Sequence, residues 1–478
     1  MSEQFLSMDD LEKIHNTSLD ILANTGIKLC HDELLDHISN FDGVKINKNE
    51  KNVRFDADII TKSITSAGRK FKLYGRDKNK SADFGYDKIV TSSSWGMPFE
   101  IDFFSNEKRP ATIKNLQQAA VMGDFLPEVD IVGAMFRPKE IPEFYRDVYE
   151  YGELIKRTVK PAGCWITDGR SFKYILEIYK LFIEGEKQIE KFPPFFYEFE
   201  PISPLVFQHD GVDILYNFAM HAMPVSAAPI PQPMSTGPAT IAGSLALGNA
   251  ELLAGLVLTQ LVRPGCPFMY GLMSNVPDPF TMIATFTGAP ENVLFSIGQG
   301  QMAHYYNFPI FMDNQINCSN QPDYQMGLEF GINCLAALSL NTDLYGHIGI
   351  AGADQGASLL KLVMDCEAVS YLKRIKEGFS VNEETLALDV IKKTGIGGNF
   401  LMHKHTLDHI RNDYWKPVNF NRDSYTVWAK KGKKSLIDRC SQYQEHILKN
   451  HQVDFVSPEL EKEIDKIVNS ARQNLKNN

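Results

Sequence analysis

Aromatic and amide side chains follow a series of short apolar segments along this chain. The positions are Trp95, Phe136-Arg137, Trp165, Phe199-Glu200, Gln232, Met273-Ser274, Asp313-Asn314-Gln315, Tyr345 and His347. Aromatic rings attract a quaternary ammonium group through cation–π interactions, each worth up to about 2 kcal/mol when desolvated. We therefore expect an aromatic, nearly uncharged cavity that holds a permanent cation. For any single aromatic residue, packing inside the fold is an equally good interpretation, so the prediction depends on the group.

The residues at these positions do not support hydrolytic or proton-transfer chemistry. These positions supply no paired carboxylates, no nucleophile elbow and no His/Glu metal triad. His403 and His405 form an HxH pair with His409 nearby, but no third ligand type has suitable spacing, so we expect no metal site. His347 ends the eighth apolar segment and is either a ligand-binding residue or a core histidine that hydrogen-bonds to the backbone.

The elements that position these residues alternate between two types. Eight apolar segments are short enough for buried parallel strands, at 89–95, 129–136, 160–167, 194–200, 223–230, 266–273, 308–315 and 342–349. Helical patterns separate or follow them at 111–126, 143–156, 171–185, 212–222, 240–262, 290–306, 323–340 and 354–376. Eight strand–helix units predict an α/β fold of the (β/α)8 TIM-barrel type, whose site lies at the carboxyl ends of the strands.

An open doubly wound sheet is the alternative, but the only GxG near a strand (298–300) lies inside a predicted helix. The expected organisation is an N-terminal helical and mixed extension (1–88), the barrel (89–376) and a C-terminal helical region packed on it (377–478). The C-terminal region carries a basic patch at 430–434, which is either a solvated face or a docking surface for an acidic partner.

Composition narrows the class of protein. The 478 residues include 49 Lys and Arg against 59 Asp and Glu, a net charge of -10 that argues against binding nucleic acid. The seven cysteines form no CxxC pair, and the first residues lack a secretion signal, so we expect reduced cysteines and a cytoplasmic location. Residues 241–262 are apolar enough to imitate a membrane span, but Asn249 and Glu251 inside them favour a buried helix and no membrane association.

Several longer strings resemble the trimethylamine methyltransferase family, which consists of corrinoid-dependent enzymes. The strings are FKLYGRDK (71–78), GNAELLAGLVLTQLVRPG (248–265), GAPE (288–291), PDYQMGLE (322–329), SVNEETLALDVIKKTGIGGNFL (380–401) and LKNHQVDFVSPEL (448–460). They span nearly the whole chain. The resemblance implies a barrel enzyme that moves a methyl group from an amine to the cobalt of a partner corrinoid protein.

One departure from the family pattern bears on the substrate. Members that use trimethylamine carry pyrrolysine just after the seventh strand, where this chain has Gln315 or its neighbour, and no pyrrolysine is present. The chain is therefore similar to the non-pyrrolysine branch, which demethylates quaternary amines such as glycine betaine or proline betaine. Transfer of a methyl group from a quaternary nitrogen needs no proton donor, because the leaving group is a neutral amine. The enzyme then has to orient the methyl group and exclude water.

With a betaine as substrate, the positions of individual residues at the strand ends predict their roles. Trp95, Phe136, Trp165, Phe199 and Tyr345 would form the trimethylammonium cage, Arg137 or His347 would hold a betaine carboxylate, and Asn314 and Gln315 would position the methyl group. The chain would bind no cofactor tightly, since it lacks the DxHxxG signature of corrinoid proteins, and cobalamin would come with the partner. The helix that begins at Asp323 is one docking edge to consider. Members of the family are often homo-oligomers, a property for which this sequence carries no signal.

Two other functions stay open at this stage. One is a non-catalytic barrel that binds betaines, which would keep the cage and lack methyl transfer. The other is an unrelated barrel activity such as a lyase or decarboxylase, for which no strand end supplies an inward Lys or a metal triad. The bulky groups at several strand ends favour a small betaine, glycine betaine or proline betaine, as the substrate.

Overall fold

Eight short strands form the centre of the protein in a computed structural model, which describes residues 5–183, 188–286, 288–313 and 316–476. They are β6 (Val90–Ser93), β9 (Val132–Gly133), β10 (Ala162–Gly163), β11 (Tyr197–Phe199), β13 (Val225–Ala227), β14 (Phe268–Tyr270), β15 (Phe311–Met312) and β16 (Leu344–Ile348). Each of the eight segments predicted as a strand contains one of them.

Neighbouring strands of this set pair in parallel. Ladders join β9 to β10, β11 to β13, β13 to β14, β15 to β16 and β16 to β6. Single bridges, Ser92 with Ile131 and Tyr270 with Ile310, connect β6 to the start of β9 and β14 to the start of β15. Among the described residues no pairing joins β10 to β11. The parallel α/β architecture is therefore confirmed, whereas closure into a barrel is not shown.

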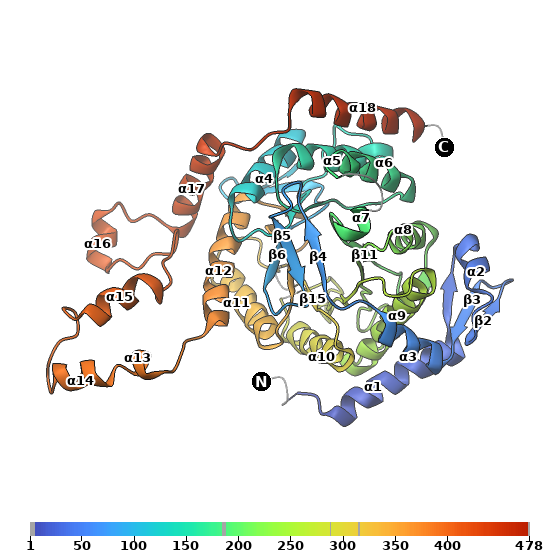
Figure 1. The fold of residues 1–478 in the computed structure, drawn as a ribbon, viewed down its shortest axis with the longest axis horizontal. Coiled ribbons are helices and arrows are strands. Elements are labelled where there is room, and N and C mark those ends of the chain that lie inside the picture. Colours follow the sequence, from blue (N-terminus) through green and yellow to red (C-terminus); the bar gives the residue numbers. More distant parts are fainter. Residues whose placement is uncertain (1–4, 184–187, 287, 314–315, 477–478) are drawn as a thin grey trace.

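Helices surround the strands in the view of Figure 1. They are α4 (Ile113–Phe125), α5 (Glu143–Arg157), α6 (Gly169–Lys180), α8 (His209–Met220), α9 (Ile241–Val262), α10 (Pro290–Tyr306), α11 (Tyr324–Ser339) and α12 (Leu359–Glu377), with the short α7 (Gln188–Lys191) before β11. The GxG at 298–300 lies within α10, as expected. Helix α12 begins later than predicted, because Ser358 caps it and the preceding residues form β17 (Ile350–Ala351) and β18 (Gly356–Ala357).

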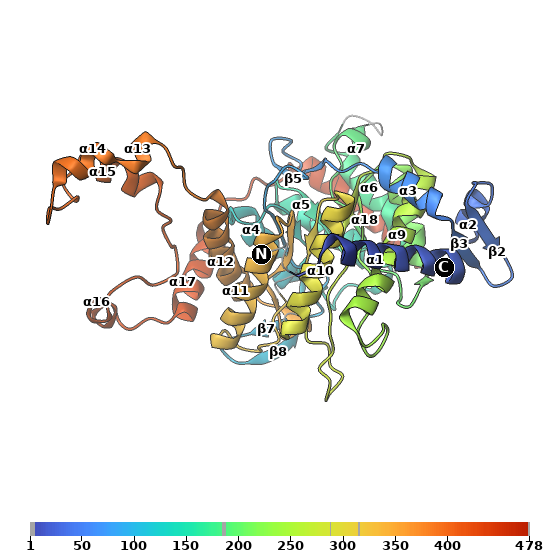
Figure 2. The same cartoon turned by 90° about the horizontal axis from the view of Figure 1, so that it is seen from below.

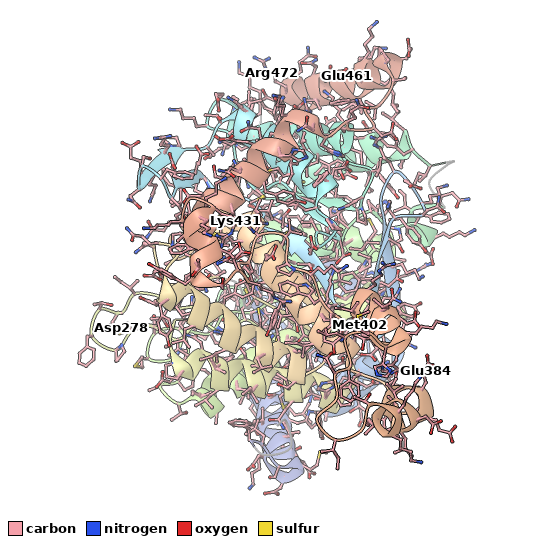
Figure 3. All side chains as sticks on the ribbon, turned by 90° about the vertical axis from the view of Figure 1, so that its left-hand side faces the viewer. Asp278, Glu384, Met402, Lys431, Glu461 and Arg472 are labelled. Carbon is pink, nitrogen blue, oxygen red and sulfur yellow. The ribbon has the colours of Figure 1, made fainter. Side chains whose placement is uncertain are left out.

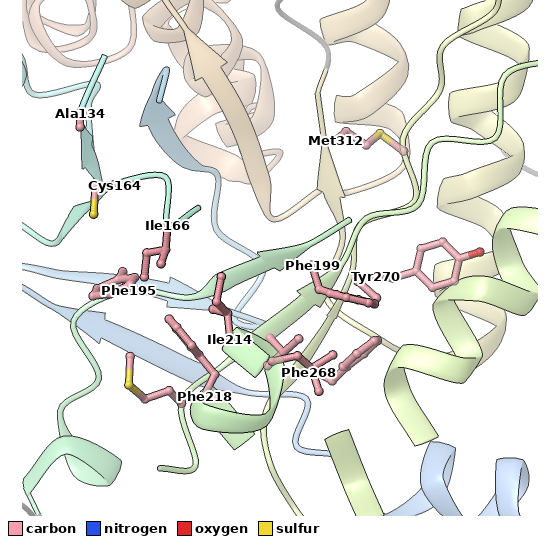
Figure 4. Packing of buried hydrophobic residues seen from close by; sticks show 14 of the residues in the cluster. Ala134, Cys164, Ile166, Phe195, Phe199, Ile214, Phe218, Phe268, Tyr270 and Met312 are labelled. Carbon is pink, nitrogen blue, oxygen red and sulfur yellow. The ribbon is translucent and has the colours of Figure 1, made fainter. Parts of the chain in front are cut away.

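Two hydrophobic clusters lie on opposite sides of the strands. The inner cluster contains Val90, Met269, Phe311 and Leu344 from the strands, and the hairpin of β4 (Phe71–Tyr74) and β5 (Ser81–Phe84), which crosses the ring in Figure 1. The outer cluster lies between strands and helices, and Figure 4 shows part of it, with Phe195, Ile214 and Phe218 among its members. Because side chains alternate along a strand, these clusters reveal which residues point inward.

Smaller elements extend the central unit. The N-terminal region contains α1 (Met8–Asp20), a π-helical turn (Ile21–Thr25), α2 (Asp32–Ile38), α3 (Ala57–Ser66) and a sheet of order β12-β1-β3-β2. Its strands are β1 (Ile27–Leu29), β2 (Val44–Asn47), β3 (Asn52–Phe55) and β12 (Val206–Phe207). β7 (Phe99–Asp102) and β8 (Glu107–Pro110) follow β6. The C-terminal region is helical: α13 (Glu383–Leu386), α14 (Leu388–Thr394), α15 (Lys404–Asn412), α16 (Tyr425–Lys430), α17 (Leu436–Asn450) and α18 (Pro458–Asn474).

Helix α9 is the apolar segment that imitates a membrane span. It is long and apolar enough to cross a bilayer, but its residues from Ser244 to Leu261 are all buried in the protein. Its polar groups have protein partners: Asn249 donates to Ser18 and Tyr306 (both 2.9 Å), and Glu251 accepts from Ser203 (2.7 Å) and the Leu205 amide (2.6 Å). These partners confirm the interpretation of α9 as a core helix.

Candidate functional site

A cavity of about 460 Å³ opens at the carboxyl ends of the strands. Its lining comprises Trp95, Gly96, Met97, Arg137, Trp165, Glu200, Ile230, Gln232, Met273, Asn275, Phe286, Asp313, Ile316, His347, Ile350 and Asp354. A second space of about 240 Å³ shares Trp95, Trp165 and Glu200 with it and adds Glu198. We call the two together the strand-end cavity. Eight of the strand-end positions named from the sequence line it: Trp95, Arg137, Trp165, Glu200, Gln232, Met273, Asp313 and His347. Four of them, Trp95, Arg137, Trp165 and His347, are residues for which the sequence predicts a role in binding.

The Trp95 indole occupies the inner wall of this cavity. It follows β6, contacts Phe196 at 5.4 Å between ring centroids, and lies 6.3 Å from the His347 ring. Room for the indole comes from two glycines on the neighbouring strands: a Cβ at Gly133 would lie 2.3 Å from the indole, and one at Gly163 would lie 3.0 Å from it. The sequence places small residues where this large ring needs space.

A substitution at Gly163 tests the position of the indole. The added methyl of Gly163→Ala would meet only the Trp95 ring among its three nearest atoms, so we expect a displaced indole and a dissociation constant for tetramethylammonium raised several-fold. Calorimetric titration and tryptophan fluorescence measure the two effects. Gly327→Ala is the matched control, because its methyl meets nothing within 4 Å. Equal affinities of both variants and the unmodified chain would remove Trp95 from the binding site.

His347 reaches the cavity through an irregularity in β16. The register of this strand shifts between Tyr345 and Ile348, and His347 adopts a left-handed backbone conformation with φ 62°. Such a conformation is uncommon for a residue with a side chain and persists where surrounding structure enforces it. A bulge of this kind redirects a side chain across the sheet. Hence His347 faces the cavity, although regular alternation would put it on the same side as Tyr345.

The imidazole lies between two carboxyl groups. His347 Nδ1 donates to Asp313 Oδ1 at 3.0 Å, and its Nε2 lies 3.7 Å from Glu198 Oε2. Glu198 is buried, and neither of its carboxyl oxygens has a hydrogen-bond partner among the described residues. A buried polar group without a partner costs free energy, so this carboxyl group on the cavity wall is suited to a ligand.

Burial and charge shift the pKa values of this group in opposite directions. Burial lowers the pKa of His347, but the charge and hydrogen bond of Asp313 and the charge of Glu198 outweigh it and raise that pKa to about 10. Burial raises the pKa of Glu198 to about 7, and burial followed by the charge of Asp313 raises that of Asp354 to about 7. Burial and the charge of Glu198 raise the pKa of Glu200 well above its ordinary value. At neutral pH the cavity therefore holds an imidazolium and carboxyl groups that titrate there.

The expectation of a nearly uncharged cavity is wrong. Four acidic residues, Glu198, Glu200, Asp313 and Asp354, line it together with His347. The sequence already hinted at one pair, because Glu198 and Glu200 alternate with outward residues in PFFYEFE (194–200) and must share a face. Asp354 comes from the loop before α12, and Asn275 and Phe286 come from the loop after β14, so no strand pattern could identify them.

Arg137 lines the cavity, but its charge is already paired. Its guanidinium donates to Asp147 at 2.6 Å and lies 3.5 Å from Glu150, both on α5. Asp147 also accepts from the Thr167 amide at 2.8 Å, which links this pair to the loop that carries Trp165. Of the two cations predicted to hold a carboxylate, Arg137 is thus paired with the carboxylates of α5, while His347 lines the cavity between Asp313 and Glu198.

The remaining predicted aromatics do not line the strand-end cavity. Phe136, Phe199 and Tyr345 are buried in the outer cluster between strands and helices. Phe199 packs on Phe207 with ring centroids 5.1 Å apart. Phe199 points away from the cavity because side chains alternate along a strand and its neighbours Glu198 and Glu200 face inward. Asn314 and Gln315, predicted to position the methyl group, lie outside the described residues. The HxH histidines lie at the start of α15, where the His405 and His409 rings are 4.2 Å apart.

Comparisons with known proteins agree with this architecture. The family model for trimethylamine methyltransferase (MTTB) matches residues 2–475. The chain is 29% identical to the glycine betaine methyltransferase of Desulfitobacterium hafniense (strain Y51), over 96% of this chain and 94% of that one. It is 28% identical to the trimethylamine methyltransferase MttB of Methanosarcina barkeri, over 97% and 94%.

A comparison with solved structures shows a similar fold. The monomethylamine methyltransferase MtmB of Methanosarcina barkeri superposes with a TM-score of 0.54 at 10% identity, over 99% of this chain and 88% of that one. At that identity the likeness concerns the fold alone. The family match covers almost the whole chain, and it agrees with the α/β fold and the resemblance seen in the sequence. The chain therefore belongs to the trimethylamine methyltransferase family and is a methyltransferase.

Proposed function

We propose that this enzyme transfers a methyl group from a quaternary amine to the cobalt(I) of a corrinoid protein, with glycine betaine or proline betaine as the first substrates to test. The single observation that carries the proposal is the strand-end cavity, where Trp95 and Trp165 stand beside buried acidic groups. The similarity to a glycine betaine methyltransferase and the absence of pyrrolysine support the quaternary substrate.

The cavity suits a zwitterion with two differently charged ends. The trimethylammonium group would lie against the indoles and the carboxyl groups of Glu198 and Glu200, through cation–π and charge attraction. The betaine carboxylate would accept from His347, whose raised pKa keeps the imidazole charged at neutral pH. Asp313 would hold that imidazole in place through the bond to Nδ1.

The transfer itself needs no proton. The carbon–nitrogen bond would break with its electron pair remaining on nitrogen, which leaves a neutral tertiary amine, and the partner's corrinoid would supply the electron pair for the new bond to the methyl carbon. The residues of this chain have to align the methyl group with the cobalt and keep water away. We propose that the chain holds no cofactor of its own and that cobalamin arrives on the partner.

The loop after β14 is suited to receive that partner. Phe280 is 93% exposed and Ile283 is 65% exposed near its tip, while Phe286 of the same loop lines the cavity. Figure 3 shows Asp278 of this loop projecting from the body. Asp278 accepts from the amides of Phe280 (3.0 Å) and Thr281 (2.7 Å), which fixes the turn. An exposed aromatic beside a cavity mouth is typical of a contact residue in an interface.

A substitution at the loop tip separates partner binding from methyl transfer. We expect Phe280→Asp to raise the KM for the corrinoid protein more than tenfold, because it replaces an apolar contact by a charge. The rate with free cob(I)alamin should stay unchanged, since Phe280 does not line the cavity. Steady-state assays with the two acceptors measure both values. Equal losses with both acceptors would assign Phe280 to the cavity instead of the docking surface.

The experiment that tests the function uses the spectral change from cob(I)alamin to methylcob(III)alamin. A panel of glycine betaine, proline betaine, carnitine and trimethylamine is supplied with the enzyme, first with free cobalamin and then with a corrinoid protein. We expect methylation with at least one betaine and none with trimethylamine. Methylation with trimethylamine alone would overturn the proposed substrate class.

Closure of the eight strands into a (β/α)8 barrel is part of the same proposal. Support comes from the parallel pairs that connect β11 through β16 to β6, β9 and β10, and from one inner cluster contributed by strands all along the chain. In a closed barrel β10 and β11 would be neighbours. Cys164, next to β10, and Phe195, shortly before β11, both line the smaller part of the cavity, as that arrangement requires.

A further inference from the structure

The central strands leave one junction unpaired, the one between β10 and β11. In the part of the chain that the structure describes, β10 pairs only with β9 and β11 only with β13, whereas each of the other junctions has at least one bridge. Paired strands lie about 4.8 Å apart, which leaves no room for a molecule between them. The strand layer can therefore be open between β10 and β11.

The smaller space of the strand-end cavity, about 240 Å³, passes through this junction. Its lining contains side chains from both sides of the strand layer. Trp95 and Phe196 belong to the inner cluster, whereas Cys164, Phe195 and Ile214 belong to the outer cluster (Figure 4). A space on one face of the strands would contact only one of these clusters. We call this space the side passage.

The outer end of the side passage lies at the N-terminal ends of α6 and α8. Thr167, just before α6, is exposed, and Gly211, in the first turn of α8, is half-buried, and both line the passage. At its inner end the passage shares Trp95, Trp165 and Glu200 with the larger space. The place to which we assign the ammonium group therefore has two openings, one at the strand ends and one between β10 and β11.

Acidic groups stand at both ends of the side passage. At the inner end Glu198 is 4% exposed, and its carboxyl oxygens have no hydrogen-bond partner within the described ranges. At the outer end Asp210 and Asp213 lie on α8. Burial raises the pKa of Tyr197, which lines the passage, and the charges of Glu200, Glu198, Asp210 and Asp213 raise it further, so both groups of acids lie near this ring. Such a lining attracts cations.

The strand-end opening faces the side on which we place the corrinoid protein. Gly96, Met97 and Phe286 line the larger space there. In Figure 2, β7 and β8, which follow Met97, lie at the same edge of the molecule as the loop after β14, which contains Phe286, and β5 lies at the opposite edge. A partner docked at this edge would cover the strand-end opening. The side passage leads sideways instead, between two strands toward α8.

We infer that the side passage is a second route to the cavity, through which the quaternary amine enters and the tertiary amine leaves while the corrinoid protein covers the strand ends. The identity of these ligands rests on the proposed function. The inference gives a reason for Gly211. A Cβ at this position would lie 3.4 Å from the Phe199 ring and 3.5 Å from the Tyr197 hydroxyl, so a large side chain would extend into the outer end of the passage.

Exchange of tetramethylammonium tests for two routes without any partner protein. The broadening of its methyl proton signal gives the rate constants of association and dissociation. Gly211→Trp obstructs the side passage, and Gln232→Trp obstructs the strand-end opening, so either alone leaves one route. In the double variant we expect both rate constants to fall more than about tenfold below those of Gln232→Trp, with an unchanged dissociation constant, because an obstacle on a route slows entry and exit equally.

Met220→Trp is the matched control for this exchange experiment. It puts the same side chain on α8, at a position that is 53% exposed and outside the passage, so adding it to Gln232→Trp should change neither rate constant. Gly211→Trp should fold, because the nearest atoms lie at ordinary contact distances and tryptophan favours a helix more than glycine does. Gly211→Leu is a smaller obstacle that repeats the test if the tryptophan variant is unstable. Rate constants in the double variant equal to those of Gln232→Trp overturn the inference, and so does a raised dissociation constant at an unchanged association rate.

Excess corrinoid protein provides a second test, which depends on the proposed function. In the unmodified enzyme a betaine still reaches the covered cavity, so the methylation rate should hold its plateau as the corrinoid protein is raised. In Gly211→Trp the betaine has to bind before the partner, so excess corrinoid protein should lower the rate more than about fivefold, and added betaine should restore it. Methylation by the variant without this inhibition overturns the side passage. Failure of every chain to methylate would count against the proposed function, whereas the exchange experiment decides on the passage independently.

Discussion

Replacement of His347 by alanine is expected to lower the rate of methyl transfer on the order of 100-fold. The substitution removes the imidazolium that lies between Asp313 and Glu198, at 3.0 and 3.7 Å, and leaves both carboxyl groups without it in a buried site. It also removes the donor that we assign to the betaine carboxylate. Initial rates of cobalamin methylation at saturating and limiting betaine separate the effect on KM from the effect on kcat.

Two further variants show whether the effect belongs to the site. His347→Gln keeps a donor for Asp313 without the charge, so its rate should lie between those of the alanine variant and the unmodified enzyme. His451→Ala removes another histidine paired with an aspartate, Nε2 to Asp124 at 2.8 Å, which does not line the cavity. We expect this control to keep the rate within about twofold. A similar loss in both alanine variants, with lowered melting temperatures, would indicate a structural role for His347.

Binding of a permanent cation is expected to tighten about tenfold between pH 6 and pH 8. Burial raises the pKa values of Glu198 and Asp354 to about 7, so both groups are mostly protonated at pH 6 and mostly ionised at pH 8. The ionised carboxylates attract the cation, and the protons are released on binding. Tetramethylammonium has no group that titrates in this range, so calorimetric titration at pH 6, 7 and 8 reports the protein alone.

Glu198→Gln should remove much of this pH dependence. The glutamine keeps the shape of the side chain but carries no charge at any pH, so we expect weaker binding at pH 8 and a smaller difference from pH 6. Glu251→Gln is the matched control, because burial also raises the pKa of Glu251 to about 7, while its partners Ser203 and Leu205 hold it outside the cavity. An unchanged pH dependence in Glu198→Gln would assign the titration to other groups.

The free energy of unfolding should change with pH in the opposite sense. A carboxyl group whose pKa is raised in the folded state binds more protons there than in the unfolded state at pH between about 4.5 and 7. The contribution of Glu198 and Asp354 to stability is therefore lost as pH rises through 7. Ligand binding, which favours the ionised forms, should then protect the enzyme against heat more strongly at pH 8 than at pH 6.

The strand pattern of the sequence was sufficient to locate the site but not its charge. Short apolar segments followed by helical ones are governed by local periodicity, and all eight contain a strand. The end of a strand is therefore predictable, and Trp95, Trp165, Arg137 and His347 line the cavity as expected. The direction of each side chain depends on the register of the strand within the sheet, a non-local property. For this reason the strand pattern predicts Phe199 for the site, although its neighbours Glu198 and Glu200 face inward and Phe199 faces the outer cluster.

The sequence by itself determined the α/β class, the helical and strand segments, the core position of α9 and the family. These properties follow from local periodicity or from strings that extend over most of the chain. Only the tertiary structure decided the chemistry of the cavity. The bulge at His347 turned one residue inward and left Tyr345 in the outer cluster, and the loops brought Asp354, Asn275 and Phe286 to the strands. The carboxyl groups acquired their raised pKa values only through burial beside one another, because desolvation depends on neighbours that are distant in sequence.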